Sequence, residues 1–404
     1  MTKADNKLGM NDAIEDFLLR GVENIIPNKV ELEKVMRSGK KLNVYNGIDP
    51  TAPHIHLGNA FPLRKLQALV EMGHNVTFLI GDFTALIGDT SDKDAERVAL
   101  NYETIEENFQ TYKKQAEKIL DFSKVTIVHN SQWLRKLTFE EIVRLCQHFA
   151  TGDFVGRELI RKRLSEGKRV GLHELLYPVM QGYDSYHMDT DMQLGGTDQT
   201  FNMQAGRTLQ KDLRGKESFV VANGFLTGTD GRKMSKSWGN AIWLDDSPDE
   251  MFGKAMSVKD DLIVEYFLMG TNAPLSKVEE AKKRLSSGEN PMSVKKELAS
   301  LIVTEMHGKE EAEKAKKKFE ETFQEGKVPQ DVLSLAVGEQ ISVVDLLSAL
   351  VEKGLIKSKS EGRRLVEQGG LSVVGESGSL SLESMVKAPV DLRVGKRQFV
   401  KLVK

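Results

Sequence analysis

Two short stretches of the sequence carry side chains suited to holding a polyphosphate. The first has small or polar residues at Gly47, Asp49, Thr51, His56, Gly58 and Asn59. It joins the end of an expected strand to the start of an expected helix, which is where parallel sheets place their ligands. Gly58 allows a flat group to approach the backbone, and the free N–H groups of a helix N-terminus favour a phosphate. By itself, a histidine two residues before a glycine is usually incidental.

The second stretch is the pentapeptide Lys-Met-Ser-Lys-Ser at 233–237, which follows a glycine-rich segment at 228–232. Lys233 and Lys236, three residues apart on such a loop, make a mobile cationic clamp. A clamp of this kind can close on a triphosphate and stabilise the charge that develops as pyrophosphate leaves. For five arbitrary residues, a solvated basic loop would be the better interpretation.

A third group of polar residues is arranged for a small organic ligand. Tyr177, Gln181 and Asp184 are spaced by four and three residues, so they share one face of a helix. A Gly-Gly-Thr-Asp-Gln run follows at 195–199. A phenol, an amide and a carboxylate on one helix face form a polar, directed surface rather than a core stripe. The alternative interpretation is an ordinary solvent-exposed side of a helix.

Together, the first two stretches resemble the paired signatures of the class I aminoacyl-tRNA synthetases. In that family the first signature is His-Ile-Gly-His or a near variant, and the second is Lys-Met-Ser-Lys-Ser. The second is matched at every position, and the first is matched at His56 and Gly58, with Asn59 in place of the second histidine. The segments at 177–184 and 194–199 resemble the tyrosine-pocket motifs of tyrosyl-tRNA synthetases. This resemblance extends from about Tyr45 to the end of the chain.

The resemblance implies a role for each matched residue on the amino-acid side. Tyr45 and Asp184 match the pair that hydrogen-bonds the substrate phenol, and Asp89 matches the carboxylate that holds the substrate ammonium. The full set of implied tyrosine-binding residues is Tyr45, Asp89, Tyr177, Gln181, Asp184 and Gln199. A second layer behind them is implied at Asn130 and Trp133.

On the nucleotide side, the resemblance implies ATP as a substrate that brings Mg²⁺, with no tightly bound cofactor and no protein metal site. The implied ATP contacts are Asn46, Gly47, Asp49, His56, Gly58, Asn59, Gly196, Asp198, Lys233 and Lys236. The implied catalytic residues, which contact the leaving phosphates, are Thr51, His56, Lys233 and Lys236, with Lys93 beside them. Asn46 and Asn59 depart from the family pattern, but both can hydrogen-bond a sugar. The only cysteine is Cys146, which rules out a cysteine-built zinc site.

The C-terminal segment from Ile341 carries eleven Lys or Arg and seven Asp or Glu, on a chain whose net charge is -2. A basic end on an acidic body suggests a module for a polyanion, although on charge alone a solvated surface is the simpler explanation. Residues 342–370 resemble the S4-type RNA-binding domain at the end of bacterial tyrosyl-tRNA synthetases. This resemblance implies tRNA(Tyr) as the partner, with phosphate contacts from Lys357, Lys359, Arg363, Arg364, Lys396 and Arg397.

The functional residues need a scaffold that brings distant segments together, and the apolar pattern predicts one. Strands are expected at 41–47, 75–80, 124–129, 192–194 and 218–222. Helices are expected at 12–38, 57–73 and 93–119, with a mostly helical insertion at about 130–190. Strands that alternate with helices predict an α/β fold with a Rossmann-like parallel sheet covered on both faces.

A chain of 404 residues predicts two or three domains. We expect a catalytic Rossmann-like domain at 1–240 that ends with the 233–237 loop, an α-helical anticodon-binding domain at 241–330, and a small α+β S4-like domain at 338–404. No run of 18 apolar residues and no apolar signal core occur, so we expect a cytoplasmic protein without a membrane partner. The resemblance implies a homodimer formed through the segment 130–170.

The resemblance implies tyrosine–tRNA ligase activity. In that reaction ATP activates L-tyrosine to tyrosyl-adenylate with release of pyrophosphate, and tyrosine is then transferred to the 3′ end of tRNA(Tyr). An alternative from another class stays open, namely a non-catalytic synthetase paralogue that binds RNA through its tail. The presence of Lys233, Asp184 and His56 argues against that alternative, because a retired active site has no physical need for them.

Overall fold

The computed structural model describes residues 9–88, 100–234, 238–323, 333–376, 378–395 and 398–404. The chain divides into two compact units, the first made of Met1–Ser247 with Lys254–Gly308 and the second of Pro248–Gly253 with Lys309–Lys404. The three-domain division expected from the sequence remains a prediction. Within the described ranges, no helix is both long enough and apolar enough to cross a membrane.

The first unit is built around a sheet of six strands, counted over the described residues, in the order β1-β6-β5-β2-β3-β4. The strands are β1 (Val22–Ile26), β2 (Asn43–Ile48), β3 (Asn75–Ile80), β4 (Thr126–His129), β5 (Met192–Gly196) and β6 (Phe219–Asn223). β2 to β6 run parallel to one another, and β1 pairs antiparallel with β6. β6 is buried at every position, as expected for a parallel strand covered on both faces.

The strand order places a topological switch point between β2 and β5. From β2 the chain proceeds to β3 and β4 on one side, whereas β5 and β6 lie on the other side. Connections that leave in opposite directions open a crevice at the carboxyl ends of the two central strands, where α/β sheets bind ligands.

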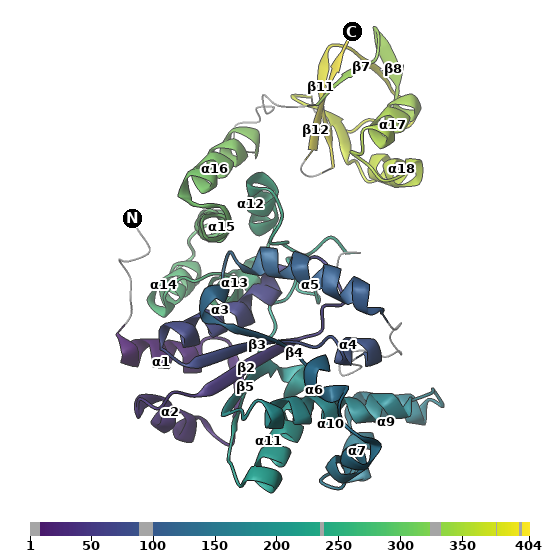
Figure 1. The fold of residues 1–404 in the computed structure, drawn as a ribbon. Helices are drawn as coiled ribbons and strands as arrows, with labels where there is room; N and C mark the ends of the chain where they lie inside the picture. The colour runs from purple at the N-terminus through teal and green to yellow at the C-terminus, as the bar shows by residue number, and fades with distance from the viewer. Residues whose placement is uncertain (1–8, 89–99, 235–237, 324–332, 377, 396–397) are drawn as a thin grey trace. The chain divides into compact units, whose positions relative to one another are not determined.

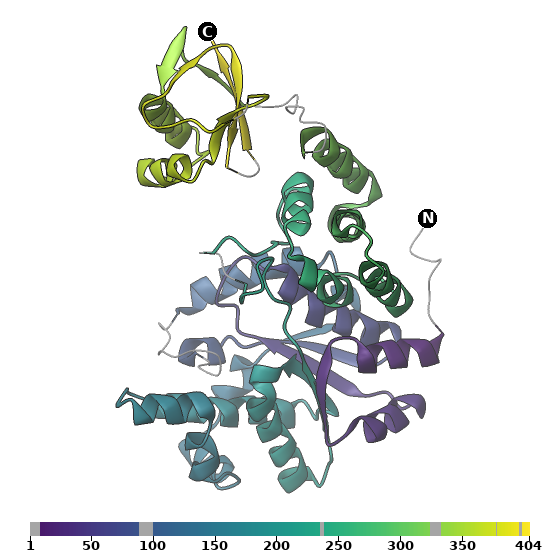
Figure 2. The same cartoon turned by 180° about the vertical axis from the view of Figure 1, so that it is seen from behind.

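Helices cover both faces of this sheet. α3 (Leu57–Glu71) and α5 (Tyr102–Ala116) lie on one face, and α10 (Leu172–His187) and α11 (Thr200–Arg214) lie on the other (Figure 1, Figure 2). The other helices of the first unit are α1 (Met10–Leu19), α2 (Lys29–Arg37), α4 (Thr84–Ile87), α6 (Ser131–Leu134), α7 (Phe139–Cys146), α8 (Thr151–Val155), α9 (Glu158–Ser165), α13 (Ile263–Gly270), α14 (Leu275–Ser286) and α15 (Pro291–His307). α12 (Pro248–Met256) contributes residues to both units.

The parallel sheet is confirmed and the segment 130–190 is mostly helical, as expected, but the helix expected at 12–38 is wrong. That segment forms α1, then strand β1, then α2. Val22–Ile26 pairs with β6 at the edge of the sheet. The helical periodicity of the flanking segments hides a short strand whose partner lies far along the chain, so local pattern reading misses it.

α10 and α11 approach each other closely because of glycines. A Cβ atom on Gly182 would lie 3.1 Å from the backbone carbon of Ala205, and one on Gly206 would lie 2.7 Å from the Cβ of Ser185. The start of α10 is fixed by a buried ion pair in which Arg163 Nη1 lies 2.6 Å from Glu174 Oε2. The polar face of α10 is therefore held at a fixed position.

The second unit contains α16 (Lys309–Phe323) and a small α+β fold. Its strands are β7 (Leu333–Ala336), β8 (Gln340–Ser342), β9 (Leu371–Val373), β10 (Met385–Lys387), β11 (Val390–Val394) and β12 (Gln398–Val403). α17 (Val343–Glu352) and α18 (Lys359–Glu367) bury residues such as Leu346 and Val366 in a core with β9, β11 and β12. The likeness of this fold to an S4 domain stays a prediction.

Candidate active site

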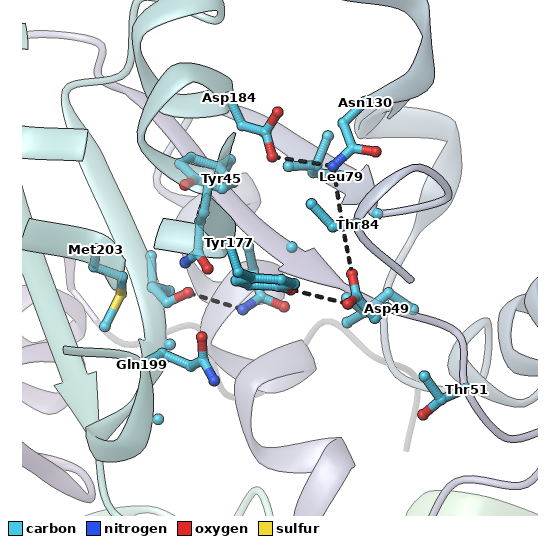
Figure 3. Close-up of a pocket in the computed structure, with 18 of the residues that line it drawn as sticks. Tyr45, Asp49, Thr51, Leu79, Thr84, Asn130, Tyr177, Asp184, Gln199 and Met203 are labelled. Carbon is cyan, nitrogen blue, oxygen red and sulfur yellow. Dashed lines mark hydrogen bonds between the residues drawn. The ribbon is translucent and has the colours of Figure 1, made fainter. Parts of the chain in front are cut away.

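A cavity of about 290 Å³ lies at the carboxyl ends of β2 and β5. The residues around it come from strand ends, from the N-terminus of α3 and from one face of α10 (Figure 3). The structure brings together most of the residues singled out from the sequence, because the lining includes Tyr45, Asn46, Gly47, Asp49, Thr51, Asn59, Asn130, Tyr177, Gln181, Asp184, Gly196 and Gln199.

One end of the cavity presents a buried carboxyl group. Asp184 is 2% exposed. Its Oδ1 accepts a hydrogen bond from Trp133 Nε1 at 2.7 Å, and its Oδ2 accepts one from Asn130 Nδ2 at 3.1 Å. Burial raises the pKa of the Asp184 carboxyl to about 8, against the lowering effect of these two bonds. A buried carboxyl group beside a cavity favours a ligand with a polar group that can hydrogen-bond to it.

Tyr45 lies at the same end and is oriented by a residue that the sequence analysis missed. Its hydroxyl donates to Gln193 Oε1 at 3.0 Å, and Gln193 Nε2 donates to the carbonyl of Met203 at 2.9 Å. Because the hydroxyl proton is used on Gln193, the Tyr45 oxygen can accept a hydrogen bond from a ligand. An amide between two apolar residues of strand β5 was the only sequence signal for Gln193.

A chain of hydrogen bonds runs along the cavity wall. Tyr177 Oη donates to Asp49 Oδ2 at 2.9 Å, and Thr84 Oγ1 donates to Asp49 Oδ1 at 2.8 Å. Asn130 Nδ2 donates to Thr84 Oγ1 at 3.0 Å and also reaches Asp184, so the chain links the two carboxyl groups (Figure 3). Thr84 was also not predicted from the sequence, because its hydrogen bond with Asn130 arises only when β3 and β4 lie side by side.

The N-terminus of α3 contributes Asn59 to the lining of the cavity. His56 is the N-cap residue, and its N–H donates to Asn59 Oδ1 at 3.0 Å. The amide oxygen of Asn59 is therefore used within the helix end, which leaves the NH₂ group for a ligand. Burial, together with the charge of Lys233, lowers the pKa of His56 to about 4, so its imidazole is neutral near pH 7. Gly58 lies next to His56 in the first turn.

The carboxyl end of β5 is packed so closely at Gly196 that a side chain there is excluded. A Cβ atom on Gly196 would lie 2.6 Å from Asp198 Oδ1 and 2.7 Å from the ring of Phe225. Asn46 crosses from β2 and donates from Nδ2 to the carbonyl of Leu194 at 2.9 Å. Phe225 is 55% exposed beside this edge. A lone phenylalanine carries no sequence pattern, so Phe225 could not be predicted as a site residue.

Several predicted residues do not line the cavity itself. Trp133 donates a hydrogen bond to Asp184, His56 and Gly58 adjoin Asn59 at the start of α3, Asp198 lies beside Gly196, and the charge of Lys233 acts on His56. Asp89, Lys93, Lys236, Lys396 and Arg397 fall outside the described residues. In the second unit, the exposed side chains at or beside α18 include Lys357, Lys359, Arg363 and Arg364. Among the described residues, no group of three or more His, Cys, Asp or Glu could hold a metal ion.

The class of protein follows from a family model for class I tRNA synthetases of the tryptophan and tyrosine type, which matches residues 37–324. The chain belongs to this family. Within it, a tyrosine–tRNA ligase of Carboxydothermus hydrogenoformans is 41% identical over 96% of this chain and 97% of its own length. The tyrosine–tRNA ligases of Legionella pneumophila strain Philadelphia 1 and Thermotoga maritima are 40% and 39% identical, with at least 96% of each chain covered.

Solved structures share the fold. A C-terminally truncated mitochondrial tyrosyl-tRNA synthetase of Aspergillus nidulans has a TM-score of 0.64 at 23% identity, covering 77% of this chain and 94% of its own. A tyrosyl-tRNA synthetase of Archaeoglobus fulgidus, solved with L-tyrosine, has a TM-score of 0.60 at 22% identity, covering 76% and 100%. The Rossmann-like α/β fold expected from the sequence is therefore confirmed.

Proposed function

We propose that the chain activates L-tyrosine with ATP to give tyrosyl-adenylate and then transfers tyrosine to the 3′ end of tRNA(Tyr). The observation that carries this proposal is one cavity lined both by a buried carboxyl group, that of Asp184, and by Asn59 in the first turn of α3. The buried carboxyl suits a phenol and the helix N-terminus suits a polyphosphate. The names of the curated relatives point to the same reaction.

In the proposed reaction the tyrosine carboxylate attacks the α-phosphate of ATP and pyrophosphate leaves. The nucleophile is already an anion, so no general base is needed, and catalysis consists of positioning and stabilisation of the leaving charge. Thr51, His56 and the two lysines Lys233 and Lys236 would contact the leaving phosphates, and Mg²⁺ would enter with ATP as part of the substrate. Neutral His56 can donate one N–H to a phosphate oxygen.

Selection of tyrosine would come from the phenol end. Phenylalanine in the same position would leave the buried Asp184 carboxyl and the Tyr45 hydroxyl without a ligand partner. Each buried polar group left unpaired costs roughly 1–3 kcal/mol. Tryptophan would offer an indole N–H at a different place from the phenol O–H, so the Tyr45–Asp184 geometry favours tyrosine.

The remaining partners are proposed on the same basis. A homodimer through 130–170 is supported by apolar side chains in and next to this segment, because Phe139 is 81% and Leu172 is 72% exposed. An apolar cavity of about 220 Å³ lies beside them, lined by residues such as Leu145 and Tyr183. The exposed basic residues of α18 support tRNA binding by the second unit. A cytoplasmic location agrees with these substrates.

The proposal is tested by isolating the intermediate. Protein incubated with labelled tyrosine, ATP, Mg²⁺ and pyrophosphatase, then passed over a desalting column, should retain close to one labelled tyrosyl-adenylate for each active site. Omission of ATP is the control and should leave no label on the protein. Failure to retain label, with tRNA binding intact, would favour the non-catalytic RNA-binding paralogue instead.

A further inference from the structure

Trp243 lies opposite His56 in an antiparallel bridge between two segments distant in sequence. The hydrogen bonds that flank this pair are 2.8 and 3.0 Å long and join Leu57 N–H to Ile242 O and Leu244 N–H to Ile55 O. A pair flanked in this way is the non-hydrogen-bonded type, in which opposed side chains come closest. The segment after the 233–237 loop is thus joined directly to the segment that carries His56.

The indole ring of Trp243 packs against the imidazole ring of His56. Its centroid lies 5.7 Å from that of the His56 imidazole, with the planes tilted by 59°. His54, two residues earlier and so on the same side of its strand, has its ring centroid 6.4 Å from the indole in an edge-on contact. One indole therefore contacts both histidines of the segment.

α5 holds the two paired segments in place. Gln115, which is buried, accepts the N–H of Ile55 at 3.1 Å and donates to the carbonyl of Pro53 at 2.8 Å. Lys118, just beyond the helix, donates from Nζ to the carbonyl of Leu244 at 2.7 Å. The backbone under Trp243 and the backbone under His56 therefore share one support, and the indole has a defined position against the imidazole.

The orientation of the His56 ring depends on packing contacts. Its Nδ1 is buried and has no hydrogen-bond partner among the described residues. Hydrogen bonding at that nitrogen therefore does not fix the rotation of the ring, which leaves packing to do so. With Nδ1 enclosed, Nε2 is the nitrogen left to meet a phosphate oxygen.

We propose that Trp243 is a positioning residue for adenylate formation, whose indole fixes the His56 imidazole so that Nε2 faces the leaving phosphates. This inference rests on the proposed function and adds a residue to its machinery. Trp243 is not among the residues that line the cavity, so we expect removal of the indole to act through His56.

The test is a double-mutant cycle on single-turnover adenylate formation, with wild type, Trp243→Leu, His56→Ala and the double variant. Trp243→Leu should slow the step by about three- to tenfold, which is the range that loss of one aromatic contact gives. It should leave the dissociation constant for tyrosine unchanged. In the His56→Ala background the same substitution should change the rate less than twofold. Trp243→Phe, which keeps an aromatic ring, should restore most of the rate.

Equal slowing by Trp243→Leu in both backgrounds would overturn the inference, because the indole would then act independently of His56. A matching loss of tyrosine affinity would also overturn it by indicating a general structural role. The wild-type reaction distinguishes failure of the inference about Trp243 from failure of the proposed function. If wild-type protein formed no tyrosine-dependent adenylate, the proposed function itself would be contradicted.

Discussion

At the scale of single residues, Asp184 and Tyr45 share one end of the cavity but are held by different partners. Asp184 accepts from Trp133 and Asn130, whereas the Tyr45 hydroxyl donates to Gln193. The Asp184 carboxyl and the Tyr45 hydroxyl can therefore hydrogen-bond one phenol together, one accepting from its O–H and the other donating to its oxygen. Removal of the Tyr45 hydroxyl leaves the carboxyl group in place.

We expect Tyr45→Phe to weaken tyrosine binding by about 0.5–1.5 kcal/mol, the usual worth of one hydrogen bond, with little effect on the rate of adenylate formation at saturating tyrosine. The preference for tyrosine over phenylalanine should fall by the same factor. Equilibrium dialysis and pyrophosphate exchange measure the two quantities. Tyr186→Phe, outside the cavity lining, is the matched control and should change neither. Unchanged affinity in Tyr45→Phe would contradict the assignment.

The residues that the sequence could reveal are those that carry a pattern. Tyr177, Gln181 and Asp184 follow helix spacing, and His56 and Lys233 belong to recognisable signatures. Gln193 and Thr84 follow no such pattern, because their roles arise from strands and helices brought together from distant parts of the chain. Hydrogen-bond partners of this kind cannot be read from local sequence.

A buried lysine away from the cavity gives a pH-dependent prediction. Lys65 donates to the carbonyl of Phe17 and lies 4.7 Å from the centre of the Phe17 ring. Burial lowers the pKa of its ammonium group to about 7, from 10.5. Between these values the unfolded chain binds more protons than the folded one, so this group makes the free energy of unfolding rise with pH, by up to about 1.4 kcal/mol per pH unit.

Lys65→Met should remove this contribution. The difference in unfolding free energy, variant minus wild type, should therefore decrease as the pH is raised from 7 to 10, as measured by urea denaturation at each pH. A difference that stays constant over this range would mean that Lys65 keeps its ordinary pKa in the folded protein.

At the scale of elements, α3 depends on contacts with α13 and α15. Arg64 of α3 donates to the carbonyls of Met269 and Gly270 at the end of α13, at 2.9 and 3.0 Å. It also pairs with Glu305 of α15 through two bonds of 2.8 Å. The helix that carries His56 at its N-terminus is therefore attached to the helices that follow the 233–237 loop.

Loss of this attachment should destabilise the first unit. Arg64→Met should lower the free energy of unfolding by about 3–5 kcal/mol, because it leaves a partly buried carboxylate unpaired. Arg37→Ala removes a half-exposed helical arginine that pairs with Glu33, and it should cost less than about 1 kcal/mol. Urea denaturation measures the free energy of unfolding of both variants. Equal losses would contradict the claim that the buried Arg64 pair stabilises the protein more than the exposed Arg37 pair.

The elements themselves were predictable where their periodicity was uniform. β2, β3 and the helix at Leu57–Glu71 are found within a few residues of their expected positions. β1 was missed because Val22–Ile26 becomes a strand only by pairing with β6. Strand pairing over such distances is a tertiary effect, which a helical pattern on either side conceals.

At the scale of the whole molecule, the proposed division of labour assigns adenylate formation to the first unit and tRNA binding to the second. The small α+β fold of the second unit has its own buried core, which includes Leu335, Leu347 and Leu392. Because it has a core of its own, the segment 333–404 is a reasonable unit to delete.

Deletion of residues 333–404 should therefore leave the rate of tyrosyl-adenylate formation within about twofold and abolish charging of tRNA(Tyr), because it removes the exposed basic residues at α18 that we propose contact phosphates. Both rates are measured on the same preparation, with the full chain as the control. A truncated protein that charged tRNA at the full rate would refute the role proposed for this segment.

The central claim, activation of tyrosine, is tested most directly by exchange of labelled pyrophosphate into ATP with tyrosine, tryptophan or phenylalanine in parallel. We predict exchange with tyrosine and none above background with the other two amino acids. Exchange with tryptophan in place of tyrosine would contradict the roles given to Tyr45 and Asp184. Absence of exchange with every amino acid would contradict the proposed reaction altogether.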